Sequence, residues 1–148
     1  MKNGERMKAR VQHLRERLAA LRSLAQNSRE VYLRDGNLQA AAERHFQVAI
    51  ECCLDIAKYA ILARGLQVPE QVRDVFKTLS QADLLPKDFA ETLTALAALR
   101  NRLVHVYLTV EPDKMYAYLQ DDLIHFERFI GLAASLIEAS GTPPTHPT

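Results

Sequence analysis

The fold is decided by Leu38–Leu62, which reads LQAAAERHFQVAIECCLDIAKYAIL. Apolar side chains cover most of the circumference of a helix drawn through this stretch, so we expect the most buried helix of the protein here. Asp35 and Asn37 precede it, and these residue types cap helix N-termini well. No segment alternates apolar and polar residues over enough positions to predict a strand. The sequence therefore predicts an all-α fold.

Further helices are predicted on both sides of this stretch. Toward the N-terminus, apolar residues recur at alternating steps of four and three, typical of a helix packed nearly parallel to its neighbours: Met7, Val11, Leu14, Leu18 and Leu21. We expect this helix to end or bend at 27–30. Downstream, a short helix is expected to begin at Pro69, a long one near Pro86, and a last one after Pro112 that continues to Ile137. This is an up-and-down bundle of four long helices plus one short helix, spanning 1–140, with a disordered tail at 141–148.

The composition limits the classes of protein to which the chain can belong. The chain has 148 residues, 48% of them hydrophobic, and a formal net charge of +1. This profile fits one ordinary folded domain and excludes a globally basic nucleic-acid protein, so any nucleic-acid contact must be a local patch. No apolar run approaches the roughly 18 residues of a membrane span, and the first residues lack the apolar stretch of a signal peptide. We therefore expect a cytoplasmic protein without membrane contact. The adjacent Cys52 and Cys53 are expected to be buried packing thiols.

The candidate catalytic residues lie in the segment 100–107, which reads RNRLVHVY. Glycine-rich phosphate loops, nucleophile elbows and Cys/His groups at metal-ligand spacing are absent from the sequence. Arg100, Asn101, His105 and Tyr107 stand together in an Rx4HxY pattern. If the segment continues the helix that starts near Pro86, Arg100, Val104 and Tyr107 lie within about 60° of arc. Asn101 and His105 then form an i, i+4 pair beside them.

This segment resembles the signature of HEPN proteins, specifically the HepT-like toxins of HEPN/MNT (HepT–MntA type) toxin–antitoxin pairs. Residues 42–57 are similar to the second helix of that family, and the resemblance extends over about residues 5 to 140. It implies the HEPN fold and a type VII-like toxin that cleaves RNA as a metal-independent endoribonuclease, with no cofactor. It also implies a homodimer with a composite site at its interface. Val106 departs from the family, in which an acidic residue is more usual, and this puts the local electrostatics in doubt.

The resemblance also implies roles for individual residues. Arg100 would neutralise the phosphate, Asn101 would orient the substrate or the histidine, and His105 would act as base or acid, since histidine exchanges protons near neutral pH. Tyr107 would accept AMP from the partner, a minimal nucleotidyltransferase (MNT) antitoxin, and the added anion would silence the site. From the segment alone, a tyrosine that closes a helix end, with its ring in the core, remains an equal alternative for Tyr107.

A second polar line follows the otherwise apolar helix at steps of three and four: Arg44, Gln47, Glu51, Asp55 and Lys58. One interpretation is a solvated face with internal ion pairs. The other is that Glu51 or Asp55 supports the site by anchoring Arg100 or aiding His105. The basic side chains of the first helix are expected to be mostly solvated, with some able to steer RNA: Lys8, Arg10, Arg15, Arg17 and Arg22.

The other histidines favour structural interpretations. We expect His13 to be solvated, His45 and His125 to be half-buried and hydrogen-bonded, and His146 to lie in the tail. Two alternative functions stay open at this point. One is a non-catalytic HEPN bundle that binds a nucleotidyltransferase partner or RNA, and the other is a plain dimeric interaction protein.

Overall fold

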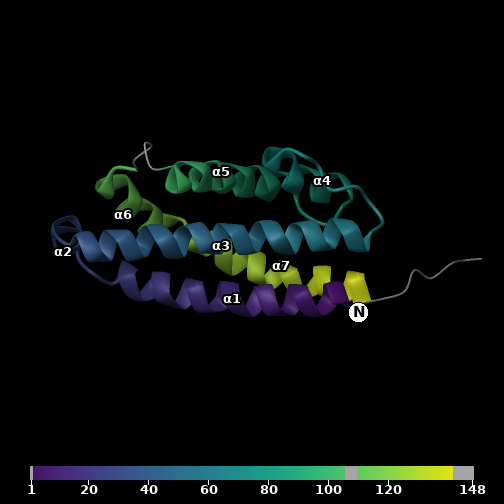
Figure 1. Cartoon of the computed structure of the whole chain (residues 1–148), viewed down its shortest axis with the longest axis horizontal. Helices are drawn as coiled ribbons and strands as arrows, with labels where there is room; N and C mark the ends of the chain where they lie inside the picture. Colours follow the sequence, from purple (N-terminus) through teal and green to yellow (C-terminus); the bar gives the residue numbers. More distant parts are fainter. Residues whose placement is uncertain (1, 106–109, 142–148) are drawn as a thin grey trace, which may run out of the picture.

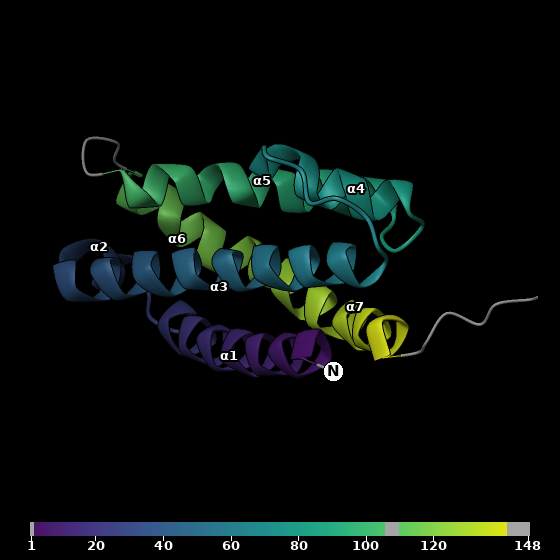
Figure 2. The same ribbon diagram turned by 45° about the vertical axis from the view of Figure 1, so that its right-hand side comes forward.

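The computed structural model describes residues 2–105 and 110–141. Its elements, in chain order, are α1 (Lys2–Ala25), α2 (Arg29–Arg34), α3 (Gly36–Ala63), the 3-10 turn η1 (Val72–Asp74), α4 (Val75–Gln81), α5 (Lys87–Val104), α6 (Pro112–Asp121) and α7 (Leu123–Gly141). The described residues contain no strand. Figures 1 and 2 show α3 running through the middle of the molecule, with α1 and α7 on one side and α4 and α5 on the other. The predicted all-α, up-and-down bundle is confirmed.

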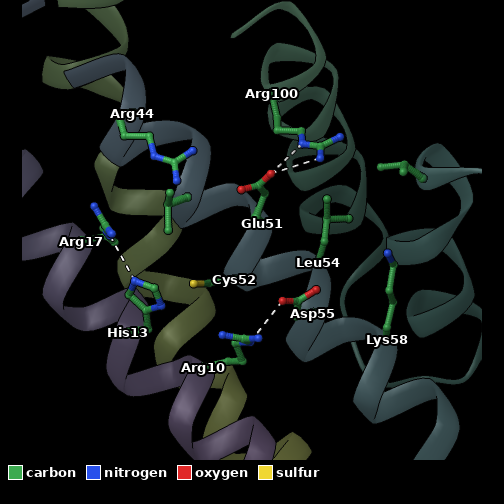
Figure 3. Close-up of a pocket in the computed structure, with 12 residues that line it drawn as sticks. Arg10, His13, Arg17, Arg44, Glu51, Cys52, Leu54, Asp55, Lys58 and Arg100 are labelled. Atoms are coloured by element: carbon green, nitrogen blue, oxygen red, sulfur yellow. Dashed lines mark hydrogen bonds and ion pairs between the residues drawn. The ribbon is translucent and has the colours of Figure 1, made fainter. Parts of the chain in front are cut away.

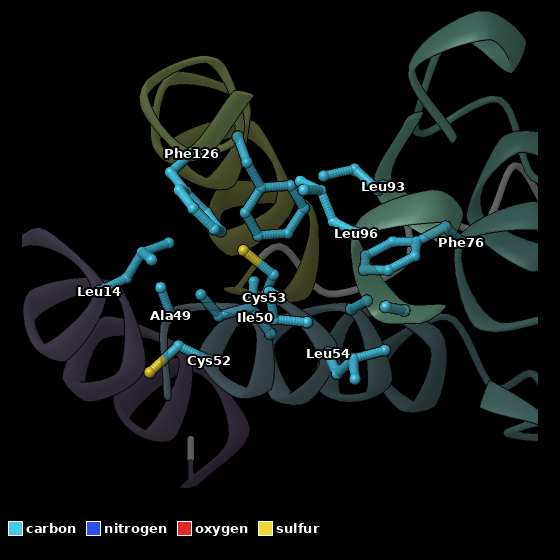
Figure 4. Packing of buried hydrophobic residues seen from close by; sticks show 14 of the residues in the cluster. Leu14, Ala49, Ile50, Cys52, Cys53, Leu54, Phe76, Leu93, Leu96 and Phe126 are labelled. Atoms are coloured by element: carbon cyan, nitrogen blue, oxygen red, sulfur yellow. The ribbon is translucent and has the colours of Figure 1, made fainter. Parts of the chain in front are cut away.

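The core forms around α3, as its sequence predicts. Twelve of its residues are buried, and the aromatic ring of Phe46 meets that of Phe126 edge-on, with centroids 5.2 Å apart. The apolar line of α1 packs against this helix, and Leu14 and Leu21 are completely buried. Figure 4 shows side chains from α1, α3, α5 and α7 meeting in one cluster. Burial of this apolar surface is the main stabilising contribution to the bundle.

A tight connection joins α1 to α3. The side chain of Ser28 accepts a hydrogen bond from the backbone N–H of Val31 and caps α2, a short helix that the sequence pattern did not predict. Asp35 then caps α3 by accepting from the N–H groups of Asn37 and Leu38. The predicted start of α3 is therefore confirmed, and α1 ends at Ala25, just before the stretch 27–30 at which we expected it to end or bend.

Two predicted helix boundaries are wrong. The helix expected at Pro69 starts only at Val72, as a 3-10 turn. Val68 and Val72 both pack against the core, and Gln71 between them has extended backbone angles, with φ −90° and ψ 127°. The last helix is also broken. Asp122 ends α6, with φ −109° and ψ −5°, and its carboxylate then contacts His125 in the first turn of α7 at 3.4 Å.

The remaining predictions about the chain have mixed outcomes. Cys52 and Cys53 are both free and buried, as expected. Gly141, assigned to the tail from the sequence, is the last residue of α7, and the rest of the predicted disordered tail, including His146, lies outside the described residues. None of the helices among the described residues combines the length and the apolar character needed to cross a membrane.

Candidate active site

The Rx4HxY segment begins in the last turn of α5, and this helix ends before His105. The helix ends at Val104, and His105 already has extended backbone angles, with φ −89° and ψ 120°. The expected i, i+4 pair of Asn101 and His105 on one helix is therefore wrong, whereas the expected arc of Arg100 and Tyr107 involves a residue outside the described ones. The β-branched Val104 and Val106 are poor helix formers, which favours an end here. Tyr107, the expected AMP acceptor, lies outside the described residues.

Arg100 is held at the inner side of α5 by a carboxylate from α3. Its Nε and Nη2 atoms both donate to Oε2 of Glu51, at 3.3 and 3.1 Å, and its Nη1 donates to Oδ1 of Asn101 at 3.3 Å. The side chains of Arg100 and Glu51 are 29% and 33% exposed. Three contacts from one guanidinium fix its orientation, so it is set in place before any ligand arrives.

Asp55, the other carboxylate considered for the site, has a different partner. Its Oδ2 atom lies 3.2 Å from Nε of Arg10 on α1. The polar line of α3 is therefore joined to the two neighbouring helices, with Glu51 facing α5 and Asp55 facing α1. The internal ion pairs expected along α3 are replaced by these pairs between helices, because neighbouring helices flank the line on both sides.

The polar line forms the floor of a cavity of about 420 Å³ between α1, α3 and α5, which we call the α3 cavity. It is lined by Arg10, His13, Arg17, Arg44, Val48, Glu51, Cys52, Leu54, Asp55, Lys58, Val72 and Arg100. Figure 3 shows Glu51 and Asp55 pointing to opposite walls, each toward an arginine. Five of the lining side chains are cationic and two are acidic, so the cavity is positive although the whole chain is nearly neutral.

A histidine–arginine cluster forms the α1 side of this cavity. Arg17 Nε donates to Nε2 of His13 at 3.2 Å, and Arg17 Nη1 lies 2.9 Å from Nδ1 of His45. Burial and the Arg17 charge lower the pKa of His45 below its usual value. His45 is half-buried and hydrogen-bonded as expected, whereas the expectation that His13 is solvated is wrong, because Arg17 and α3 partly cover it.

Sequence reasoning missed the contribution of α1. Arg10 and Arg17 were assigned to a mostly solvated basic face, yet both line the α3 cavity and both have side-chain partners. A usable signal was present, because positions 10, 13 and 17 recur at helical spacing on one side of the apolar line. Arg22, in contrast, pairs with Glu127 of α7 at 2.7 Å and faces away from this cavity.

The thiol, carboxylate and imidazole groups of the described residues limit which ligands the site can bind. The Cys52 thiol borders the cavity, and burial raises its pKa to about 11, which makes it a poor nucleophile or metal ligand at neutral pH. Within 2–105 and 110–141, no three His, Cys, Asp or Glu side chains are grouped as metal ligands. His105 is exposed at the end of α5, and His125 is half-buried beside Asp122.

An oriented arginine beside a cation-rich cavity suits the binding of phosphate esters, because a guanidinium donates to two phosphate oxygens at once. Comparison with known proteins identifies the class. Residues 14–132 match the family described as Ribonuclease HepT-like. The mRNA nuclease HepT of Shewanella oneidensis is 31% identical over 99 residues, which are 67% of this chain and 74% of that protein. The chain belongs to the ribonuclease HepT-like family, and this places it among the ribonucleases.

Solved structures support the same fold. The tri-AMPylated HEPN toxin of Shewanella oneidensis, in complex with MNT antitoxin, aligns with a TM-score of 0.81 and 24% identity over 87% of this chain and 96% of that one. YutE of Bacillus subtilis, a cytosolic protein of unknown function, aligns with a TM-score of 0.80 and 20% identity over 95% and 94% of the two chains. The bundle described above is therefore the HEPN fold.

Proposed function

We propose that the chain is the toxin of a type VII-like HEPN/MNT toxin–antitoxin pair and acts as a metal-independent endoribonuclease. The observation that carries the proposal is the Arg100 guanidinium, which Glu51 orients at the wall of the α3 cavity five residues ahead of His105. Membership in the ribonuclease HepT-like family and the likeness to an mRNA nuclease support RNA as the substrate. A site of action in the cytoplasm is consistent with this substrate.

The proposed reaction is attack by the ribose 2′-oxygen on the neighbouring phosphorus. His105 takes the 2′-hydroxyl proton or gives one to the departing 5′-oxygen, and a second acid or base completes the transfer. Arg100 stabilises the extra negative charge of the phosphorane through its guanidinium donors, and Asn101 orients the substrate. The P–O5′ bond breaks as the P–O2′ bond forms, so one product ends in a 2′,3′-cyclic phosphate and the other in a 5′-hydroxyl. In this scheme no metal or cofactor is needed.

Two copies of the chain are proposed to share the site. Arg100 and His105 lie at the C-terminal end of α5, and each chain supplies one His105, whereas the reaction uses both a base and an acid. A symmetric homodimer that brings two α5 ends together provides the second histidine. This arrangement also explains why the end of a bundle helix carries so many polar groups.

An MNT antitoxin is the proposed partner that inactivates the toxin. We propose that the partner transfers AMP to Tyr107, two residues after His105, so that the added phosphate occupies the position of the RNA phosphate. The likeness to a HEPN toxin that is AMPylated and bound to an MNT antitoxin supports this proposal.

The second candidate is a non-catalytic HEPN bundle that binds a nucleotidyltransferase or RNA. It is favoured by the contact of Arg100 with Glu51, because that carboxylate takes two of the five guanidinium donors and offsets the charge on which catalysis relies. The two candidates predict different behaviour in growing cells. Expression of the parent should arrest growth if the chain is a ribonuclease, and His105→Ala should relieve the arrest.

His125→Gln is the matched control for this experiment, since His125 lies on α7 beside Asp122 and lines no part of the α3 cavity. It should arrest growth as strongly as the parent. Equal growth of cells that express the parent and His105→Ala, at equal protein levels, would favour the non-catalytic bundle.

A further inference from the structure

The cations of the α3 cavity fall into two groups. Arg100 and Arg10 are paired with carboxylates, at 3.1 Å to Glu51 and 3.2 Å to Asp55, so each of these pairs is close to neutral. Arg17, Arg44 and Lys58 have no carboxylate partner among the residues that the structure describes. The positive charge of the cavity therefore comes from these three side chains.

Arg17 is oriented without being neutralised. Both of its side-chain partners are imidazoles, and a ring nitrogen that accepts a hydrogen bond from a guanidinium must be unprotonated. A carboxylate in the same place would cancel the arginine charge, whereas two neutral rings leave it intact. Such an arrangement suits a guanidinium that is kept ready for an anionic ligand.

Arg44 and Lys58 extend the charge along the cavity floor. They lie fourteen residues apart on α3, which corresponds to roughly 21 Å of helix and returns to nearly the same face. Figure 3 shows them at opposite ends of the row that contains Glu51 and Asp55. A single phosphate cannot reach both ends, so the row fits an extended polyanion whose charges repeat along its length.

We propose that the α3 cavity binds the phosphodiester backbone of single-stranded RNA next to the bond that is cut, with Arg17, Arg44 and Lys58 contacting different phosphates along the strand. The inference rests on the proposed function for the choice of RNA, because Arg100 lies at the wall of the same cavity and places the scissile phosphate at its edge. These contacts carry no base information, so they increase affinity equally for all sequences.

The test measures RNA binding in the full chain with His105→Ala as the common background, so that no RNA is cut. Arg44→Gln plus Lys58→Gln removes the two cavity cations that make no side-chain contact with a partner among the described residues, which limits the risk to folding. Arg15→Gln plus Lys77→Gln is the matched control, because it removes one arginine and one lysine from exposed positions outside the cavity. The dissociation constant for a short single-stranded RNA is measured over a range of KCl concentrations, and circular dichroism confirms that each variant is folded.

The cavity variant should bind RNA about ten-fold more weakly than the background, and the slope of log K against log salt should become shallower by about 1.4, or about 0.7 for each lost phosphate contact. The control variant, Arg15→Gln plus Lys77→Gln, should change the dissociation constant and the salt slope much less than the cavity variant does. If the cavity variant and the control variant weaken RNA binding equally, the loss reflects the lower net charge of the protein and not contacts in the cavity. The inference then fails, whether or not the chain cleaves RNA.

Two further results separate this inference from the proposed function. If the parent cleaves RNA and the cavity variant binds as tightly as the control, the inference fails and the ribonuclease stands. If the parent does not cleave RNA but only the cavity variant loses affinity, the inference stands for an RNA-binding bundle. Loss of affinity for AMP with unchanged affinity for RNA would overturn the inference in favour of a nucleotide site.

Discussion

The Arg100–Glu51 pair should couple the two side chains by about 1 kcal/mol of unfolding free energy. The guanidinium donates twice to one carboxylate oxygen, at 3.3 and 3.1 Å, and each side chain is about one-third exposed. Fully exposed pairs contribute roughly 0.2–1 kcal/mol because water screens them and their side chains lose entropy. Two donors and partial burial place this pair at the upper end of that range.

A double-mutant cycle measures the coupling. Glu51→Gln keeps the shape of the side chain, Arg100→Met keeps an unbranched chain of similar reach, and the double variant completes the cycle. With a urea m-value of about 2 kcal/mol/M, a coupling of about 1 kcal/mol corresponds to a midpoint shift of about 0.5 M. The shift should shrink in high salt, since the pair is partly solvated.

The Arg22–Glu127 pair is the matched control. It is shorter, at 2.7 Å, but its side chains are 50% and 64% exposed, so its coupling should be only about 0.3 kcal/mol. Coupling of Arg100 and Glu51 no larger than that of the control would refute the reasoning, because Arg100 would then not be held at the cavity wall in solution.

Three more predictions concern the thiols, a histidine and the modified tyrosine. Burial raises the pKa of Cys52 to about 11 and that of Cys53 well above its usual value, so a thiol reagent at pH 8 should label neither cysteine in the folded protein and both in urea. Rapid labelling of the folded protein would contradict their burial. Because the pKa of His45 is lowered from 6.5, the unfolded chain binds the proton more tightly, so the parent should lose stability relative to His45→Gln as pH falls through about 6.5 and below. Urea unfolding at several pH values checks this, and parallel curves for the two proteins would exclude the effect. Incubation with the cognate MNT protein, ATP and Mg²⁺ should add AMP masses to the parent and none to Tyr107→Phe, as intact mass spectrometry would show; modification of both would place the acceptor elsewhere.

The sequence predicted the bundle because its helices carry strong apolar periodicity. The pattern of α3 identified the central helix, and Asp35 marked its start. The pattern did not reveal α2, because six residues are too few for a periodic signal. It also did not show the break at Asp122, since the apolar positions of α6 and α7 keep nearly the same spacing across that residue.

The candidate site was predictable in its residue types and less so in its geometry. The resemblance to HEPN proteins singled out Arg100, and the polar line of α3 offered Glu51 as one of two carboxylates that could anchor it. The structure brings these two side chains together. Local spacing could not show that α5 ends before His105, because the end depends on backbone angles that tertiary packing helps to set. The role of Arg17 depends on contacts with His45, which is 28 residues away in the chain, and such a contact leaves no local pattern.

Cleavage of RNA without metal ions tests the central claim most directly. The purified parent and His105→Ala are incubated with single-stranded RNA in EDTA, and the product ends are identified by mass spectrometry. The account predicts fragments that end in a 2′,3′-cyclic phosphate or its hydrolysed form with the parent, and intact RNA with the variant. Intact RNA with both proteins, when the parent is free of AMP, or equal cleavage by both, would contradict it.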